Sequence, residues 1–169
     1  MTIMADKKEN INWFFQGKEI TEISQMPKDV YGFCYKIEIQ LNGKTFYYIG
    51  QKKLISQRKK KMSKKEIEAL PNKKLKKWYY VFAEMKWQIY VGSSKELLSL
   101  IKEHGEAKLK LKKEILQYAY SENELKYIEA REIMCSNSLL SDDYFNDGVS
   151  LRQVGKPNFA KKEIKTENN

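Results

Sequence analysis

The amino-acid sequence predicts an α+β domain built on a small three-stranded antiparallel sheet flanked by helices. Three observations support this fold class. Apolar and polar residues alternate over residues 32–40, an Asn-Gly pair follows at 42–43, and two capping boxes each open an apolar helical pattern. With 169 residues, of which 41% are hydrophobic, the chain can bury one core. We therefore expect a single domain with short extensions.

Residues 32–49 are predicted to form a tight β-hairpin. Alternation places Phe33, Ile39 and the two apolar side chains between them on one face of a half-buried strand. Asn42 and Gly43 favour a type I′ turn, because both central positions of that turn need a positive φ. Residues 45–49 then return as the second strand.

The turn also fixes which residues of the two strands face each other. If Leu41 and Lys44 flank it, Gly50 lies opposite Tyr35, and Tyr48 lies diagonally across from Tyr35 on the same face. Diagonal neighbours lie within about 7–8 Å, so the two phenols can converge on one ligand, with room beside Gly50. Taken alone, two strand tyrosines are better explained as core aromatics.

Two helices and a third strand complete the predicted domain. Ser93 with Glu96, and Ser121 with Glu124, have capping-box spacing and predict helices that end near residue 105 and before residue 137. Residues 109–119 alternate imperfectly and are assigned to the third strand. A short helix is expected at residues 63–70, where Pro71 ends it.

The chain divides into three parts. Residues 1–28 carry apolar side chains in a hairpin pattern and are predicted to be an amino-terminal arm that packs on the domain. Residues 29–151 form the domain, with a basic insert at 52–77, and residues 152–169 form a polar carboxy-terminal tail. Cys34 and Cys135 have no Cys or His neighbour, which argues against a zinc site or a disulfide framework.

The positive charge is concentrated in the basic insert. The chain has a net charge of +10, and residues 52–77 contain twelve basic and two acidic residues, so the rest of the chain is neutral. A surplus confined to one segment is typical of a surface that neutralises phosphates, although a solvated lysine-rich loop is the simpler alternative. We favour polyanion binding. The expected contacts are Lys52, Lys53, Lys59, Lys60 and Lys61.

Five elements, in order along the chain, resemble the GIY-YIG nuclease family. Residues 31–37 and 48–50 are similar to the two signature strands, and Arg58 is similar to the family's arginine. Residues 127–130 resemble the helix that carries the metal-binding glutamate, and residues 144–146 resemble the late asparagine segment. Segments around Trp13 and at residues 90–94 look like those of free-standing phage members. The resemblance covers roughly residues 12–151.

The resemblance implies a role for each of five side chains. Tyr35 would accept a proton from the attacking water or orient it, and Tyr48 would hydrogen-bond the phosphate or the water. Arg58 would bind the scissile phosphate through its bidentate guanidinium. Glu129 would hold a metal ion. Asn146 would orient the substrate or support the other groups, although an Asn-Asp-Gly sequence is more often simply a turn.

The general base departs from the family pattern. Met62 stands where many members have a histidine one helical turn after the arginine. Tyr35 would then have to act as the base, and a phenol has a reference pKa of about 10. It needs a nearby cation to ionise at neutral pH, and Lys52, Lys53 or a lysine after Arg58 is expected to supply one.

Glu129 is the expected metal ligand. On a helix it projects between Leu125, Ile128 and Ile133, and a carboxylate on an apolar stripe needs a partner. Mg²⁺ or Mn²⁺ fits, because such an ion can be held by one carboxylate together with waters and substrate phosphates. A salt bridge to a lysine at the edge of the core is an equally common explanation.

These inferences predict a metal-dependent DNA endonuclease of the phage homing or genome-targeting type, which makes nicks or double-strand breaks. A catalytically inactive DNA-binding accessory protein with the same fold is the alternative, and RNA binding through Trp78, Tyr79 and Tyr80 is a third. The expected partner is DNA, bound by a monomer or a transient dimer. No window approaches the roughly 20 apolar residues of a membrane span, so we expect no membrane partner and a location in the cytoplasm of the host cell.

Overall fold

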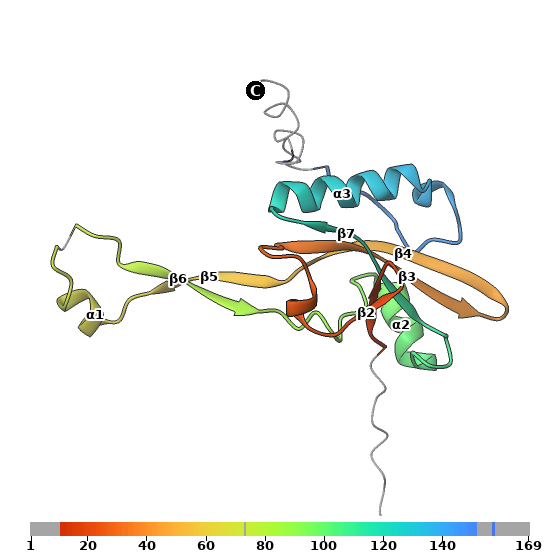
Figure 1. Cartoon of the computed structure of the whole chain (residues 1–169), viewed down its shortest axis with the longest axis horizontal. Helices are drawn as coiled ribbons and strands as arrows, with labels where there is room; N and C mark the ends of the chain where they lie inside the picture. The colour runs from red at the N-terminus through yellow and green to blue at the C-terminus, as the bar shows by residue number, and fades with distance from the viewer. Residues whose placement is uncertain (1–10, 73, 152–156, 158–169) are drawn as a thin grey trace, which may run out of the picture.

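A five-stranded mixed sheet forms the body of the protein, which the computed structural model describes for residues 11–72, 74–151 and 157 (Figure 1). The strand order is β2-β1-β7-β3-β4, and neighbours are antiparallel except β1 and β7, which are parallel. The strands of this sheet are β1 (Trp13–Phe15), β2 (Lys18–Ile20), β3 (Gly32–Leu41), β4 (Lys44–Lys53) and β7 (Lys112–Ala119).

The sheet is larger than the three antiparallel strands predicted from the sequence. Strands β3, β4 and β7 correspond to those three, but the amino-terminal hairpin joins them because β1 pairs with β7, Trp13 opposite Lys113. A pairing between segments this far apart has no local sequence signal, which is why the hairpin was assigned to a separate arm. Residues 1–10 of that arm, and all of the predicted tail at 152–169 except Pro157, lie outside the described residues.

The predicted hairpin register is confirmed. Leu41 lies opposite Lys44 and Tyr35 opposite Gly50. Asn42 and Gly43 have φ values of 52° and 78°, as a type I′ turn requires.

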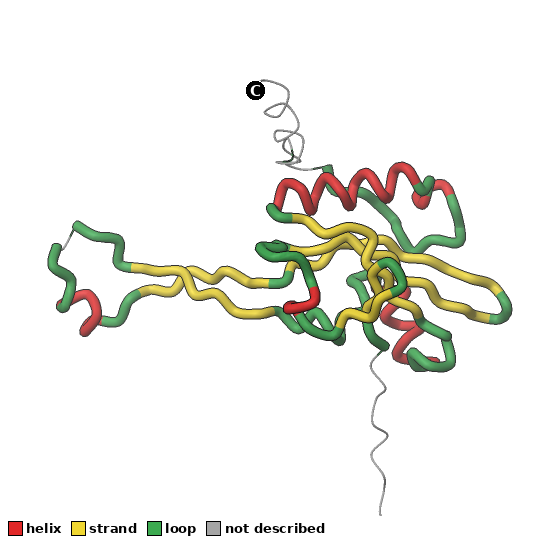
Figure 2. The backbone as a smooth tube through the Cα atoms, in the orientation of Figure 1, coloured by secondary structure: helices red, strands yellow, loops and turns green. Residues whose placement is uncertain are grey.

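One helix covers each face of the sheet (Figure 2). Helix α3 (Glu122–Cys135) packs on β3, β4 and β7, and helix α2 (Lys95–His104) covers the opposite face. The predicted cap of α3 is confirmed, since the Ser121 hydroxyl accepts a hydrogen bond from the Glu124 N–H. The predicted cap of α2 was wrong by one residue. Ser94 caps this helix, and Ser93 has a different partner. Two 3₁₀ turns, η1 (Ile23–Gln25) and η2 (Ser138–Leu140), complete the body.

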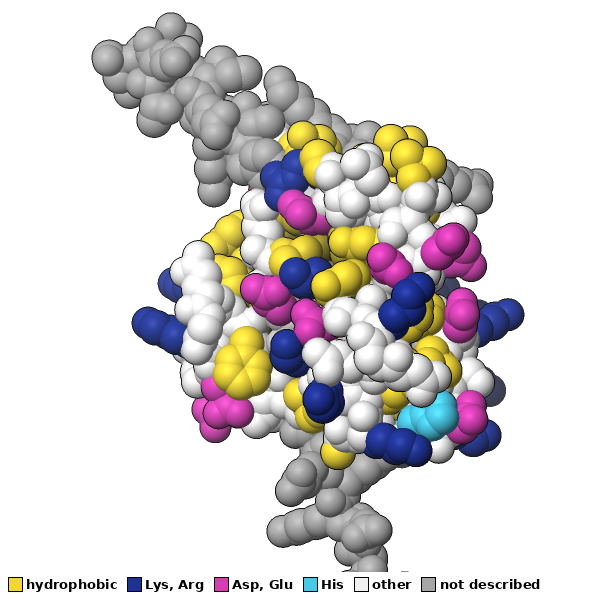
Figure 3. Space-filling view, turned by 90° about the vertical axis from the view of Figure 1, so that its right-hand side faces the viewer, with side chains coloured by type: hydrophobic (Ala, Val, Ile, Leu, Met, Phe, Trp, Pro, Cys, Tyr) yellow, Lys and Arg dark blue, Asp and Glu magenta, His cyan; other side chains and the backbone are white. Residues whose placement is uncertain are grey.

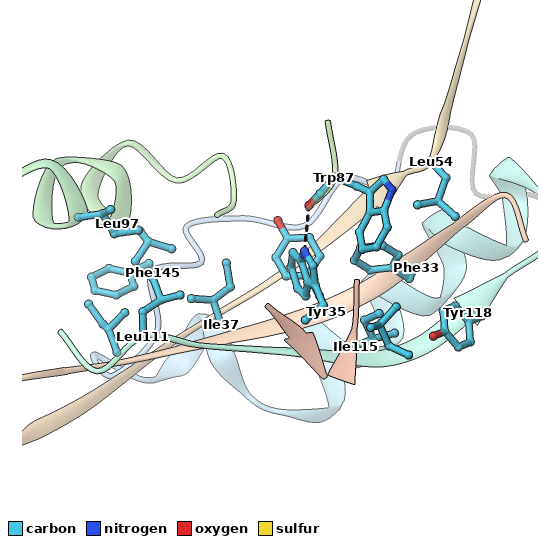
Figure 4. Close-up of a cluster of buried hydrophobic side chains, with 14 of the residues drawn as sticks. Phe33, Tyr35, Ile37, Leu54, Trp87, Leu97, Leu111, Ile115, Tyr118 and Phe145 are labelled. Carbon is cyan, nitrogen blue, oxygen red and sulfur yellow. Dashed lines mark hydrogen bonds between the residues drawn. The ribbon is translucent and has the colours of Figure 1, made fainter. Parts of the chain in front are cut away.

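The core on the α2 side is rich in aromatic side chains (Figure 4). Trp13 is fully buried, and its indole N–H donates to the Trp87 carbonyl at 2.9 Å. Lys113 is also buried: its Nζ lies 4.8 Å from the centre of the Trp13 ring and donates to the Gln88 carbonyl at 2.6 Å. Burial lowers the pKa of Lys113 to about 8. These bonds hold residues 87–88 against the sheet.

A two-stranded antiparallel ribbon projects from the body and contains the predicted basic insert from residue 55 on, whereas Lys52 and Lys53 belong to β4 (Figure 1). It consists of β5 (Ile55–Lys61), the short helix α1 (Lys64–Glu68) near its tip and β6 (Trp78–Glu84), and none of these elements contains a buried side chain. Leu54 anchors it: this residue is buried, its N–H donates to the Tyr31 carbonyl, and its carbonyl accepts from the Met85 N–H. In the described ranges, no helix has the length and apolar character needed to cross a membrane.

Candidate active site

Tyr35, Tyr48 and Gly50 meet on the α2 side of the hairpin, next to the outer edge of β4. The rings of Tyr35 and Tyr48 lie 6.2 Å apart, centre to centre. Gly50 makes this possible, since a Cβ there would overlap the Tyr35 hydroxyl, lie 2.7 Å from its Cζ and lie 3.0 Å from Tyr48 Cε1. The convergence predicted from the hairpin register is therefore present in the structure.

Tyr35 is completely buried, and its hydroxyl has no hydrogen-bond partner among the described residues. The pairing of β3 with β7 shifts register between Cys34 and Tyr35, and the extra residue lies on β7, so Tyr35 keeps its regular place opposite Gly50. Burial raises the pKa of the Tyr35 phenol well above its ordinary value, and the phenols of Tyr90 and Tyr48 raise it further. The expectation that a lysine lowers this pKa was wrong, because Lys52 packs on Tyr90 instead.

Tyr48 is held in place by two residues of the segment before α2. Its hydroxyl and the Ser93 hydroxyl are hydrogen-bonded at 2.9 Å. Gly92 lies against its ring with φ +98°, and a Cβ there would lie 3.0 Å from Tyr48 Cε1. Glycine is needed at this position both for its backbone conformation and for the close approach. Burial raises the pKa of Tyr48, although the Ser93 hydrogen bond opposes that change.

Tyr90 and Lys52 extend the site toward the ribbon. The Tyr90 ring lies edge-to-face with Tyr35 at 5.9 Å, and the Lys52 Nζ lies 3.9 Å from the centre of the Tyr90 ring. Burial lowers the pKa of Lys52. Neither Tyr90 nor Ser93 was predicted from the sequence to be a catalytic or binding residue. The one available signal was the similarity of residues 90–94 to phage members.

Glu129 approaches the same region from α3. It is half-buried, and burial raises its pKa to about 7 even though a backbone hydrogen bond from Gln51 acts in the opposite direction. Its charge also contributes to the raised pKa values of Tyr35 and Tyr48, so the three groups are electrostatically coupled. Glu129 forms no ion pair within the described part of the chain, so the alternative of a salt bridge to a lysine is not observed there.

Asn146 closes the outer edge of β4 beside Gly50. Its side-chain oxygen accepts from the Ile49 N–H at 2.9 Å, and its side-chain nitrogen donates to the Ile49 carbonyl at 2.8 Å. Two residues earlier on the same edge, the Tyr47 N–H donates to the Asp143 carbonyl, and the Tyr47 carbonyl accepts from the Phe145 N–H. The amide of Asn146 thus acts as a substitute for a neighbouring strand, and it positions the strand that carries Tyr48.

Arg58 does not join this cluster. It lies on the ribbon, eight residues beyond Gly50, which at ~3.3 Å per residue is on the order of 26 Å along the chain. Lys59, Lys60 and Lys61 are also on the ribbon. The spacing between Gly50 and Arg58 matches the family pattern, so the sequence did not indicate that the chain leaves the sheet after β4 and carries Arg58 onto the ribbon.

Two surface clefts lie near the site, and the wall of one of them contains Tyr48. One, of about 490 Å³, has Tyr48 in its wall together with Ser93, the start of α2 and residues 144–147. The other, of about 520 Å³, lies at the base of the ribbon and includes Lys52, Arg58 and Lys86. By contrast, the end of the body opposite the ribbon shows basic and acidic side chains interspersed (Figure 3). The positively charged approach to the site is therefore on the ribbon side.

An α+β domain in which two hairpin tyrosines converge, with a helix glutamate electrostatically coupled to them, agrees with the resemblance to GIY-YIG nucleases. Residues 13–149 match the family described as "Putative endonuclease segE, GIY-YIG domain", and the chain belongs to this family. A search of curated proteins and a search of solved structures gave no match. The chain therefore contains a nuclease domain, and the substrate that such a domain implies is DNA. GIY-YIG nucleases generally use divalent metal ions.

Replacing Gly50 with alanine tests the packing of the two tyrosines. We expect Gly50→Ala to lower the free energy of unfolding by about 1–3 kcal/mol, because the new methyl group overlaps Tyr35. The measurement is urea denaturation. Gly148→Ala is the matched control, since a Cβ at Gly148 meets nothing within 4 Å. Adding Tyr35→Phe to Gly50→Ala should restore part of the loss, and equal stability of the two single glycine variants would contradict the packing shown here.

Proposed function

We propose that the protein is a metal-dependent DNA endonuclease and that phosphodiester hydrolysis takes place at the β4 edge, between Tyr48 and Glu129. One observation carries the proposal. A half-buried carboxylate with a raised pKa, and with no cationic side chain bound to it in the described residues, is electrostatically coupled to two converging phenols. Ionisable groups shifted in this way, next to a cleft and in a nuclease family, are typical of a reacting centre.

The metal ion would be held by Glu129. The described residues contain no group of three or more His, Cys, Asp or Glu side chains that could enclose an ion, and we propose Glu129 as its protein ligand. Mg²⁺ or Mn²⁺ fits a single carboxylate, because these ions keep several waters and take substrate phosphate oxygens as ligands. When bound, the ion supplies positive charge to the phosphate and to the leaving oxygen. The carboxylate is available for binding above about pH 7, where Glu129 is ionised.

The tyrosines would position the phosphate and the attacking water. Tyr48, already hydrogen-bonded to Ser93 in the cleft wall, is placed to donate to a phosphate oxygen. Tyr35 stays protonated at neutral pH because its pKa is raised, so its role would be that of a hydrogen-bond donor rather than a base. Lys52 would supply positive charge next to the tyrosines, because it contacts the Tyr90 ring and lines the cleft at the base of the ribbon.

The ribbon would bind the DNA backbone that leads to this centre. Arg58 and Lys52 line one cleft, so both can contact successive phosphates of a strand running from the ribbon to the tyrosines. A two-stranded ribbon also has the width to enter the major groove. We propose that Arg58 contributes to DNA binding along this path, which differs from the family role at the scissile phosphate, and that the protein serves a homing or genome-targeting function in a phage.

A catalytically inactive DNA-binding protein remains the second candidate, and the separation of Arg58 from the tyrosines favours it. Incubation of the purified protein with supercoiled plasmid, with and without Mg²⁺, distinguishes the two. Nicked or linear product that depends on Mg²⁺ supports the endonuclease. Binding of the plasmid without any cleavage, in Mg²⁺ and in Mn²⁺, supports the inactive protein.

Glu129→Gln should abolish cleavage and at the same time stabilise the metal-free protein at pH 8. The folded-state pKa of about 7 lies above the ordinary 4.5, so ionisation destabilises the fold as pH rises from about 4.5 to 7, and the glutamine variant avoids this loss. The expected gain is about 1–3 kcal/mol.

Thermal denaturation at pH 8 and at pH 4.5 measures the effect of Glu129→Gln. The two proteins should differ at pH 8 and converge at pH 4.5. Mg²⁺ should raise the melting temperature of the wild type and leave the variant unchanged. A Mg²⁺ shift of equal size in both proteins would place the ion elsewhere.

Tyr35→Phe should reduce the cleavage rate by roughly two orders of magnitude while DNA affinity and melting temperature change little. The buried hydroxyl has no partner among the described residues, so its removal leaves no group unsatisfied. The wild-type rate should rise with pH through about 7, where Glu129 ionises, and then level off, because the phenol does not titrate below pH 10. Cleavage by Tyr35→Phe at the wild-type rate would reduce Tyr35 to a core aromatic.

Charge-neutral substitution of the ribbon lysines should flatten the salt dependence of duplex binding. Each phosphate that a protein neutralises contributes about −0.9 to the slope of log affinity against log salt. The triple change Lys59→Gln, Lys60→Gln and Lys61→Gln should therefore reduce the slope by about two to three. Fluorescence anisotropy at several salt concentrations measures it. The control removes the same charge from exposed lysines of the body, Lys18, Lys102 and Lys108, and an equal flattening there would move the binding surface off the ribbon.

A further inference from the structure

The ribbon has two faces of different composition, and only one of them leads to the tyrosines. Cross-strand partners share a face, so Arg58 and Val81 lie on the face that continues into the cleft with Lys52. The opposite face carries Gln57, Lys59 and Lys61 from β5. From β6 it carries three aromatic side chains, Trp78, Tyr80 and Phe82, which we call the aromatic ladder.

Two rings of the aromatic ladder, Tyr80 and Phe82, are exposed, and the third, Trp78, is part-exposed. Neighbouring rings lie 5.1 Å apart for Trp78 and Tyr80 and 6.5 Å apart for Tyr80 and Phe82. Tyr80 is 48% exposed and Phe82 is 63% exposed, on a ribbon with no buried side chain. A row of exposed rings on a projecting element is typical of a binding surface, since it contributes nothing to the core.

Lysines without carboxylate partners accompany the rings. The Nζ atoms of Lys59 and Lys76 lie 4.0 and 5.0 Å from the centre of the Trp78 ring. No lysine of the described part of the ribbon forms a salt bridge. This face therefore combines flat apolar surface with uncompensated positive charge.

The same face ends in a hollow where the ribbon meets the body. This hollow, of about 400 Å³, has Tyr31, Phe82 and Tyr120 in its wall, with Ile55 and Val30 as aliphatic neighbours. Its polar members are Asp29, Gln57 and Lys53, and the Lys53 Nζ lies 5.2 Å from the centre of the Tyr31 ring. Rings for stacking, hydrogen-bonding groups of both kinds and a cation are the components that hold an unpaired base.

We propose that the aromatic ladder and this hollow form a binding track for unpaired nucleotides, separate from the duplex-binding face that carries Arg58. A nucleotide strand is the ligand that matches both properties of the surface, because each unit carries a π face and a negative charge. A second copy of the chain does not match, since the lysines of two ribbons would repel. The proposal goes beyond the endonuclease function and does not depend on cleavage.

The spacing of the ladder favours a strand whose bases are drawn apart. The ring centres lie 5.1 and 6.5 Å apart. Both distances exceed the ~3.4 Å rise per nucleotide of one strand in duplex DNA. Paired and stacked bases also keep their faces covered, so the rings of the ladder can stack only on bases that have left a duplex.

The test compares binding of a labelled twelve-nucleotide thymidine strand with binding of a labelled duplex, by fluorescence anisotropy with the full chain. Tyr80→Thr combined with Phe82→Thr should weaken binding of the single strand by at least about tenfold, since each stacked base contributes on that order, and should change duplex binding less than twofold. Threonine keeps the strand propensity of these exposed positions. The matched control is Tyr79→Thr with Val81→Thr on the opposite face, which should leave single-strand binding unchanged.

Two further measurements separate stacking from charge. An abasic strand with the same number of phosphates should bind the wild type no better than the thymidine strand binds the ladder variant. Thymidine binding should quench tryptophan fluorescence, and Trp78→Phe should remove the quenching, because Trp13 and Trp87 are completely buried. A uridine strand bound equally well supports a track for unpaired nucleotides of either sugar, and a marked preference for it supports the track and identifies RNA as its ligand.

Three results would overturn the proposal itself. The ladder variant could bind the thymidine strand as tightly as the wild type does. The abasic strand could bind as tightly as the thymidine strand, which would reduce the surface to a charged one. A dimer detected by sedimentation in the wild type and lost in the ladder variant would assign the surface to self-association. A failure of plasmid cleavage affects none of these readouts, so the two proposals stand or fall separately.

Discussion

The outer edge of β4 is the constraint on which the rest of the site depends. An edge strand presents unpaired backbone groups, and here side chains and a loop satisfy them at Tyr47, Ile49 and Gln51. Asn146 supplies both a donor and an acceptor to Ile49, and Glu129 accepts from the Gln51 N–H. The bonds that protect the edge thus also bring the carboxylate of α3 to within electrostatic reach of Tyr48.

The site stores unfavourable interactions that the core around it supports. The Tyr35 hydroxyl is buried without a partner among the described residues, and Glu129 has a pKa raised by burial. Gly50 and Gly92 leave no spare room for the Tyr35 and Tyr48 rings. The unpartnered hydroxyl and the buried carboxylate each reduce stability, and a ligand that bonds to either of them recovers part of that free energy. This is the energetic arrangement expected where binding, and not folding, determined the choice of residues.

Local patterns predicted the hairpin, its register and the position of α3 correctly, because these depend on turn chemistry, alternation and a cap within a few residues of each other. The convergence of Tyr35 and Tyr48 followed from that register. The parallel pairing of Trp13 with Lys113 could not be predicted, since it joins distant segments through backbone bonds alone. Ser93 looked like a helix cap and instead bonds Tyr48, because the choice between two adjacent serines is made by a tertiary contact. The position of Arg58 was missed for a related reason: sequence spacing fixes distance along the chain but not direction after Leu54.

Leu54 stands between β4 and β5 as the single residue that joins the sheet to the ribbon. Side chains alternate between the two faces of an extended chain. Whether the number of residues in this junction is odd or even therefore decides which ribbon side chains lie on each side of the body. Lys52 and Arg58 share one side, whereas Lys53 and Phe82 share the other. Insertion or deletion of one residue here, matched by the same change beside Met85 where β6 returns to the body, would keep every ribbon side chain yet exchange the two faces, so that the aromatic rings would adjoin the tyrosines and the arginine would point away. The length of this junction is therefore a functional character of the protein in its own right, and relatives that keep the composition of the ribbon but change that length by an odd number of residues should present their DNA-binding groups on the opposite side.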